Sequence, residues 1–272
     1  MCECWCRPIH GDTEVDSNCN GIYVSATLTL TVRITKAQSV TARWLRPNSV
    51  SRRWNHQSIT PSEPVRVLCV TISSDLGLDK HVSNVCAAGL FRLRQLRRIW
   101  RSLDFDSAAT LVHAFVSSRM DYCNALFAGA PKSVTDRLQR VLNMAARIVS
   151  GTRKYDHGLT DLMHNELHWL AIPDRVKYKL GMLMCRCQHN QAPRYLMDHC
   201  SPVSDVVFRL RLRSASSHQL FMPRHRLSTY GRQAFSVAGP TVWNSLPDDL
   251  RDPECFEDIF KQLLKMFLFS QY

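Results

Sequence analysis

The sequence is short of acidic residues and has no long apolar run. Its 272 residues carry 35 Lys and Arg against 23 Asp and Glu, a formal net charge of +12. Such an excess favours polyanionic partners, nucleic acid first, although a merely basic soluble protein has the same composition. No run of about eighteen apolar residues occurs, and the start lacks the apolar stretch of a signal peptide. We therefore expect no membrane partner and an intracellular protein, in the nucleus or the cytoplasm.

Cysteine is plentiful, but its placement does not indicate disulfides or metal. The eleven cysteines belong to a chain long and apolar enough to fold without a disulfide framework. Cys86, Cys123 and Cys187 fall in helix-like patterns and are predicted to be small buried residues. The N-terminal cluster lacks a second ligand pair at finger spacing. In the second cluster the two nearest thiols point about 200° apart on a helix. The clusters are Cys2, Cys4 and Cys6, and Cys185, Cys187, His189, His199 and Cys200.

Apolar spacing predicts a mainly α fold, a helical bundle with a short β-strand before it and an irregular arginine-rich segment before a terminal helix. A β-branched run at 65–72 predicts a buried strand, and 23–34 one or two short strands. Residues 201–240 are expected to be irregular. Helices are predicted over about 80–101, 106–126, 133–150, 173–187 and 256–268.

Local signals suggest where these helices begin and end. Asp106 is expected to cap the second helix, and Ser133 with Asp136 resembles a capping box for the third. Gly151 is expected to close that third helix. Pro173 suits a first helical turn.

Five segments carry a resemblance to a known family. They are, in order, VRVLCVTISSDLGLDKHVSNVC, SAATLVHAFVSSRMDYCNALFAG, DRLQRVLNMAARIVSGTRKYDH, LHWLAIPDRVKYKL and RSASSHQLFMPRHRLSTYGRQAFSVAGPTVWNSLPDDLRD. From Val65 onward the chain resembles the C-terminal region of jockey- and chicken-repeat-type non-LTR retrotransposon (LINE) reverse transcriptases. The ordered set, rather than any one segment, supports this resemblance.

The resemblance implies a division into regions. Residues 63–155 would be a thumb-like helical domain, which grips a template–primer duplex behind the active site. Residues 156–272 would be a C-terminal connector region with helices and a basic loop. Residues 1–62 are expected to be degenerate or poorly ordered. The family has Gly where this chain has Cys69, a damaging change if that Gly allows a close backbone approach.

The acidic residues that polymerisation needs are not found where the resemblance would place them. Two-metal phosphoryl transfer requires paired aspartates, and no such pair precedes Val65. The adjacent Asp248 and Asp249 are typical of a solvated turn, and Asp121 is expected to make a structural bond within the bundle. We therefore expect a truncated RNA-directed DNA polymerase, without the catalytic palm and the endonuclease, that has no activity and no cofactor, although the parent polymerase would need Mg.

Non-specific binding to the backbone of an RNA or DNA template–primer is the expected residual function. Between Lys80 and Lys154 thirteen Lys and Arg accompany four Asp and Glu, and the stretch from Arg209 to Arg232 adds six arginines. Arginine forks suit phosphates, and thumb contacts grip backbone shape rather than base edges. Trp100, Phe221 and Tyr230 are aromatic residues able to stack on bases. The candidate binding residues are Arg92, Arg94, Arg97, Arg98, Arg101, Arg137, Arg140, Arg147, Arg153, Lys154, Arg209, Arg211, Arg213, Arg224, Arg226 and Arg232.

Other interpretations remain open at this point. The basic stretches also fit a solvated positive face. The chain also fits a helical protein-interaction module retained by a host, without enzymatic activity, that binds a partner through the apolar terminal helix. A third interpretation is a translation of genomic sequence whose bundle folds poorly without its palm. The oligomeric state stays open.

Overall fold

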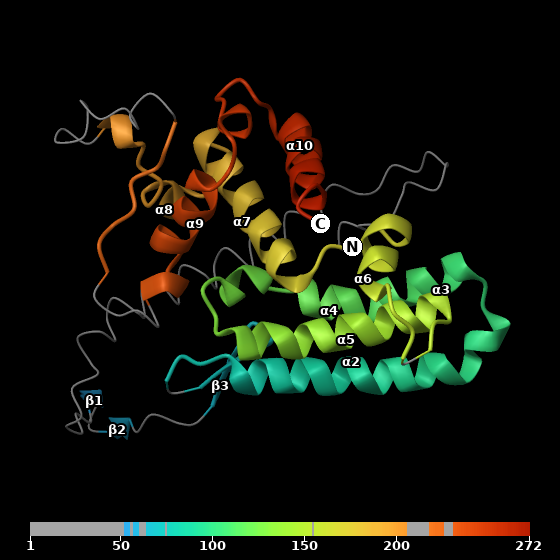
Figure 1. Ribbon diagram of the computed structural model, residues 1–272. Coiled ribbons are helices and arrows are strands. Elements are labelled where there is room, and N and C mark those ends of the chain that lie inside the picture. Colours follow the sequence, from blue (N-terminus) through green and yellow to red (C-terminus); the bar gives the residue numbers. More distant parts are fainter. Residues whose placement is uncertain are drawn as a thin grey trace.

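The structure, a computed structural model, is mainly helical, with two short antiparallel hairpins ahead of the first long helix, which confirms the predicted fold class. Figure 1 shows a lower bundle of helices and an upper group gathered around one helix, α7. No helix among the described residues is long and apolar enough to span a membrane. The strands predicted between 23 and 34 lie outside the described residues. The structure describes residues 52–54, 57–59, 64–73, 75–153, 155–205, 218–225 and 231–272.

The β-branched run at 65–72 forms a hairpin, so the prediction of one buried strand is wrong. Strand β3, Val65–Val67, pairs antiparallel with β4, Val70–Ile72. Leu68 and Cys69 make the turn, with φ angles of 45° and 65°. Two left-handed residues between antiparallel strands are typical of a turn that favours asparagine and glycine. The turn could not be recognised from the sequence, because Leu68 and Cys69 are neither asparagine nor glycine.

Cys69 is the second left-handed residue of this turn. It is exposed, so a glycine here would relieve the left-handed backbone rather than allow a close approach of a neighbouring segment. Tyr122 donates a hydrogen bond to the Leu68 carbonyl oxygen at 2.8 Å, which fixes the turn against the helices. The other hairpin joins strand β1, Arg52–Trp54, to strand β2, Gln57–Ile59.

The bundle consists of α2 and α5, which run side by side in the same direction, and a helical rod that returns in the opposite direction and packs against both (Figure 1). Arg137, early in α5, donates a hydrogen bond to the Asp79 carbonyl at the start of α2. Gly151, just after α5, lies against Trp100, just after α2. The elements are α2 Asp79–Ile99, η1 Trp100–Ser102, α3 Phe105–Val112, the π-helical turn η2 His113–Ser117, α4 Ser118–Asp121, η3 Asn124–Phe127 and α5 Lys132–Ser150.

Side chains at three- and four-residue steps fill the centre of this bundle, as the spacing predicts. Each fully buried aliphatic side chain contributes roughly 1.5–3 kcal/mol relative to an exposed one. Gly89 lets α2 approach closely, because a Cβ there would lie 3.1 Å from a methyl carbon of Val141. The buried residues include Val82, Leu93 and Leu96 of α2, Val112 and Val116 of the rod, and Leu138, Leu142 and Ala145 of α5.

Two of the predicted helix starts are wrong. Asp104, not Asp106, caps α3, and its carboxylate accepts a hydrogen bond from the Ser107 amide at 3.2 Å. Helix α5 begins directly after Pro131, so Ser133 lies inside its first turn and makes no capping box. The predicted end is confirmed, because Gly151 closes α5 in the left-handed conformation with φ of 71°.

The upper group is organised around α7, which contacts the bundle as well as α9 and α10. Pro173 lies in the first turn of α7, as predicted. One hydrophobic cluster extends from Val70 to Leu268, so both groups of helices share a core. The elements are α6 Leu159–Asp161, the π turn η4 Leu162–Glu166, α7 Ile172–Gln188, α8 Arg194–Met197, η5 Val203–Asp205, η7 Gly231–Gln233, α9 Phe235–Asn244, η8 Asp248–Leu250 and α10 Glu257–Phe269.

Helix α9 corrects the prediction that residues 201–240 are irregular throughout. Gly239 and Pro240 resemble breakers in the sequence, yet both are buried inside this helix. A Cβ on Gly239 would lie 2.5 Å from the sulfur of Met184, so the glycine allows α9 and α7 to approach closely. Tertiary packing here overrides a weak local propensity.

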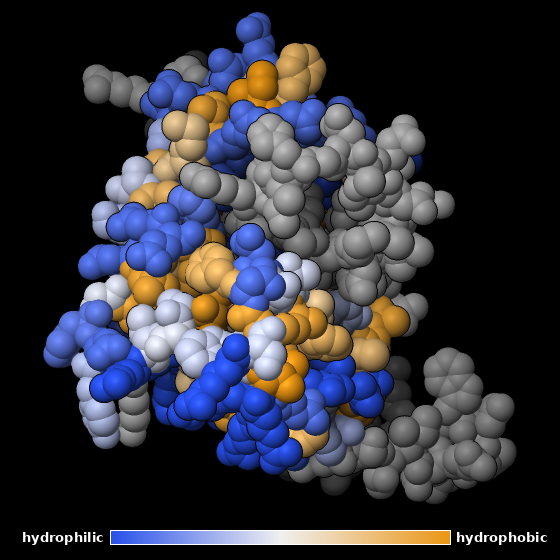
Figure 2. All heavy atoms as spheres, turned by 90° about the vertical axis from the view of Figure 1, so that its right-hand side faces the viewer, coloured by the Kyte–Doolittle hydropathy of each residue, from blue (hydrophilic) through white to orange (hydrophobic). Residues whose placement is uncertain are grey.

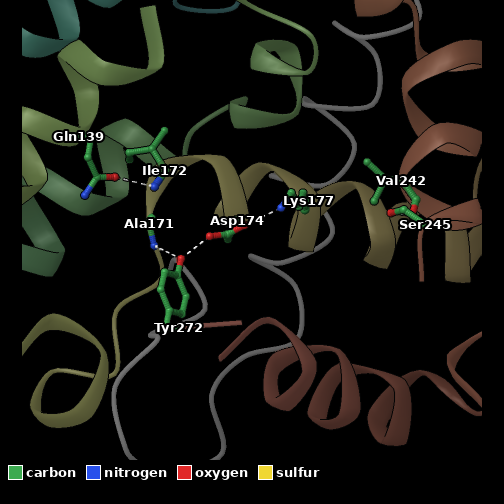
Figure 3. A network of polar contacts seen from close by, with 8 residues as sticks. All are labelled: Gln139, Ala171, Ile172, Asp174, Lys177, Val242, Ser245 and Tyr272. Atoms are coloured by element: carbon green, nitrogen blue, oxygen red, sulfur yellow. Dashed lines mark hydrogen bonds and ion pairs between the residues drawn. The ribbon is translucent and has the colours of Figure 1, made fainter. Parts of the chain in front are cut away.

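Polar contacts also hold the start of α7 in place (Figure 3). Gln139 of α5 accepts a hydrogen bond from the Ile172 amide at 2.8 Å. The Tyr272 hydroxyl contacts both the Ala171 amide and the Asp174 carboxylate. The bundle and the segment after α10 therefore meet at the same end of α7.

Candidate nucleic-acid interface

Three arginines of α2, together with Arg101 of the η1 turn that continues it, share one side. At about 100° per residue, Arg94, Arg97, Arg98 and Arg101 fall within a sector of about 100°, next to the buried stripe. All four are exposed. Figure 2 views the molecule from the end at which α2 finishes and shows strongly hydrophilic side chains gathered along its lower edge.

Helix α5 adds guanidinium groups to the same surface. Arg140 is exposed, and Arg137 and Arg147 are half-buried. Arg137 bridges the two helices, since it also donates to Ser83 Oγ at 3.2 Å and lies 3.7 Å from the Asp79 carboxylate. We name the set formed by both helices the arginine strip. It consists of Arg94, Arg97, Arg98, Arg101, Arg137, Arg140 and Arg147.

The electrostatics of Cys86 locate two strip residues beside α2. Burial raises the pKa of the Cys86 thiol, and the positive charges of Arg137 and Arg140 partly oppose that rise. Both guanidinium groups therefore lie beside the first half of α2. The seven-residue step from Arg94 to Arg101 covers roughly 10 Å at 1.5 Å per residue, which matches about three nucleotide steps along one strand of a duplex.

Arg92 lies apart from the strip. Its guanidinium carbon lies 5.7 Å from the centre of the Phe91 ring and 5.8 Å from that of Phe115. It also donates to the side chain of Gln95 at 3.1 Å. The structure thus gives Arg92 contacts with neighbouring side chains on a different side of α2 from the other four arginines.

The remaining predicted residues do not extend the strip as one surface. Arg153 and Arg224 are exposed at separate places, and Arg232 lies against the Gly129 turn beyond the other end of the rod. Phe221 is half-buried. Lys154, Arg209, Arg211, Arg213, Arg226 and Tyr230 lie outside the described residues.

Sequence reasoning missed a buried arginine. Arg175 of α7 is 1% exposed, forms a 2.8 Å ion pair with Asp121 of α4, and donates through Nε to the Leu170 carbonyl at 2.8 Å. Burial raises the pKa of Asp121, and Arg175 acts against that rise. Asp121 makes the structural bond that was predicted, but its partner lies on α7 and not within the bundle. The pair joins the bundle to α7 and is shielded from solvent, so it does not form part of a binding surface.

A histidine lies beside this ion pair. His113 is 8% exposed, and its ring meets the edge of Trp169 with 5.2 Å between ring centres. Burial, followed by the charge of Arg175, lowers the pKa of His113 to about 4. His113 is therefore neutral at pH 7.

The cysteines of the upper group are buried among apolar side chains. Burial raises the pKa of Cys185 to about 12, and a hydrogen bond with Cys187, with burial second, raises the pKa of Cys200. Metal ligation needs thiolates, which these environments disfavour. Cys185 Sγ lies 3.6 Å from Nδ1 of His189. The described residues contain no group of three or more His, Cys, Asp or Glu able to hold a metal ion.

The adjacent aspartates near the C-terminal end sit at the surface. Asp248 and Asp249 are exposed in η8, and Asp248 pairs with Arg251. One carboxylate is thus engaged in an intrachain ion pair, which fits the predicted turn.

Comparison with protein-family models, with curated proteins and with solved structures finds no match to this chain.

Proposed function

We propose that this chain binds the phosphate backbone of RNA or DNA through the arginine strip, as the thumb-like helical region of a non-LTR retrotransposon reverse transcriptase, and that it does not itself polymerise. The observation that carries the proposal is the juxtaposition of α2 and α5, which brings seven arginines to one side of the bundle. Within this set, Arg137 also pairs with the carboxylate of Asp79 on α2. The resemblance from Val65 onward supports the same partner class.

Counterion release gives the proposal a quantitative form. Each neutralised phosphate contributes about −0.9 to the slope of log affinity against log salt for duplex DNA and about −0.7 for single strands. Five contacts therefore give a slope of about −3.5 to −4.5. A solvated positive face that makes no direct phosphate contacts binds weakly, and its log affinity changes much less with log salt. The contrast separates a binding surface from a merely basic one.

The test compares two triple variants with the same loss of charge. Arg94, Arg98 and Arg101 are replaced by Gln in one, and the exposed residues Arg119, Lys132 and Arg194 in the other. Fluorescence anisotropy with a blunt duplex, over a range of salt, should show the slope reduced by about 2–3 only in the strip variant. Equal loss in both variants, or a flat salt response of the unaltered protein, would overturn the proposal.

The second half of the proposal concerns turnover. Primer extension on an RNA template with magnesium measures it directly. We expect no extended primer at any protein concentration, because the resemblance places the metal-binding aspartates in a palm for which this sequence has no matching pair. An extended product that depends on added nucleotides would contradict the absence of polymerisation but not the binding of nucleic acid.

One observation favours a second candidate function, a protein-interaction module. The outer face of α10 exposes Phe256 by 70%, Ile259 by 53%, Leu263 by 38% and Met266 by 68%. Phe260, Leu264 and Leu268 form its buried face. In Figure 2 apolar side chains reach the surface at the upper end, where the chain enters α10. An apolar stripe of this kind is typical of a contact surface.

The pattern of this stripe fits a second copy of the chain. An antiparallel pair of α10 helices centred on Lys261 opposes Phe256 to Met266 and Ile259 to Leu263. The same alignment brings Asp258 of one copy near Lys265 of the other, as a self-complementary interface requires. Sedimentation equilibrium should show a weak dimer that Ile259→Glu abolishes and Gln262→Glu retains. A monomer at all concentrations would remove this candidate.

A further inference from the structure

A hollow lies at one end of the arginine strip. It occupies about 350 Å³, within the range of small-molecule sites. The end of α2, the start of α3 and the end of α5 meet there. Its lining includes Trp100, Arg101, Asp104, Phe105, Val149 and Ser150.

Two aromatic side chains line this hollow. Phe105, the first residue of α3, is 46% exposed. Trp100 rests against Gly151, where a Cβ would lie 2.9 Å from a ring carbon. The glycine therefore lets the indole lie close to the end of α5. Aromatic faces of this kind stack on nucleobases without regard to sequence.

The charges around the hollow differ from those of the strip. Arg101 belongs to the strip and reaches the rim of the hollow, whereas Asp104 places a carboxylate there. The side chain of Ser107, and after it the Ser107 amide that donates to Asp104 Oδ2 at 3.2 Å, keep the pKa of Asp104 below its ordinary value through hydrogen bonds. An ionised carboxylate repels phosphate but retains capacity to accept N–H donors from a base edge. The hollow thus favours a base, and the strip favours the backbone.

We infer that the hollow receives one unpaired nucleobase from a nucleic acid whose backbone lies along the arginine strip. The inference rests on the proposed function and adds a ligand subsite to it. The base would stack on Phe105 and Trp100, and Arg101 would hold the phosphate that leads into the hollow. A duplex with a single-stranded overhang is therefore the preferred ligand, rather than a blunt duplex.

The experiment compares a blunt duplex with the same duplex bearing a short overhang, whose first unpaired base is 2-aminopurine. We expect the overhang to bind on the order of tenfold more tightly, since each stacked base adds that much or more. The 2-aminopurine fluorescence should fall on binding. Phe105→Ala should abolish both effects while blunt-duplex affinity stays unchanged. Phe91→Ala, at a position 55% exposed and outside the hollow, should retain both.

The outcomes separate this inference from the proposed function. Equal affinity for both ligands, with no change in fluorescence, would overturn the base site and leave the strip intact. Equal effects of the two phenylalanine substitutions would overturn it as well. Absence of salt-dependent binding to either duplex would overturn the proposed function. Trp100→Leu provides a second variant, and circular dichroism confirms that each variant keeps its helical content.

Discussion

The bundle and the helices that follow it use arginine in opposite ways. In the bundle, Arg94 and Arg98 of α2 and Arg101 of η1 are exposed along one side. In the upper group, Arg175 and Arg251 are buried, and each has a carboxylate partner. The same side chain thus serves as a surface charge in one region and as an internal tie in the other. Burial and pairing separate the two uses, which a count of charges cannot do.

The difference follows from how many neighbours each helix has. Helix α7 contacts α5, α9 and α10, so an arginine on it enters a low-dielectric environment and needs a partner. Helix α2 packs against α5 and the rod along one stripe and leaves the side that carries the strip arginines in water. A guanidinium on that side costs no desolvation and stays available for phosphate.

The strongest way to break this comparison is to remove the buried guanidinium. Arg175→Met leaves Asp121 as an unpaired carboxylate that is only 15% exposed. We expect a loss of about 3–5 kcal/mol in the free energy of unfolding. Urea unfolding followed by circular dichroism measures it.

A double variant supplies the control for that substitution. Asp121→Leu together with Arg175→Met removes both charges, and apolar replacements of buried pairs are often neutral. The double variant should therefore recover much of the lost stability. A single variant that loses less than about 1 kcal/mol would show that the pair is not a structural tie.

Acid should loosen the junction between the two regions through His113. Its pKa is lowered to about 4 in the folded protein, against about 6.5 when unfolded. A lowered pKa means that the stabilising contribution is complete above pH 6.5 and is lost as pH falls toward 4. The loss amounts to at most about 3 kcal/mol. His81 and His164 are shifted in the same direction, whereas the raised pKa of Asp121 acts in the opposite sense.

Comparison of variants isolates the share of His113. The unfolding free energy of His113→Gln should change less between pH 7 and pH 4.5 than that of the unaltered protein. His157→Gln, at an exposed position, should leave the pH profile unchanged. Parallel profiles for all the proteins would contradict the assignment to His113.

Strong apolar periodicity made the long helices predictable. The positions of α2, α5, α7 and α10 follow from apolar steps of three and four residues. The turn at Leu68 was hidden inside a β-branched run, because its left-handed residues are not the usual ones. Helix α9 was hidden by a glycine and a proline whose roles depend on the packing of α7.

The candidate site was predictable in part. Helical angles alone separate Arg92 from the other arginines of α2, although the count of basic residues treats them alike. Arg175 carried a signal too, since it lies three residues after Ile172 on the apolar stripe of α7. The hollow beside Trp100 could not be predicted, because it depends on how the ends of α2, α3 and α5 meet.

The loss of stability at a partly exposed ion pair should fall between that at the buried pair and that at the exposed strip. Arg186 of α7 meets the Glu257 carboxylate of α10 at 2.5 and 2.7 Å through two nitrogens, and the side chains are 24% and 26% exposed. Solvent screens such a pair, so Arg186→Met should cost about 1 kcal/mol. Thermal unfolding at low and high salt measures it, and the loss should shrink as salt rises. A loss as large as that of Arg175→Met would erase the distinction drawn from burial.

The smallest effect on stability should come from the strip itself. Arg94→Gln and Arg98→Gln should each change the free energy of unfolding by less than about 0.5 kcal/mol, because both side chains are exposed and such positions rarely support the fold. Each should nevertheless lower the salt slope of duplex binding by about 0.9. Urea unfolding and anisotropy on the same protein samples measure both quantities. Stability that falls together with affinity would mean that these arginines hold the bundle rather than its ligand.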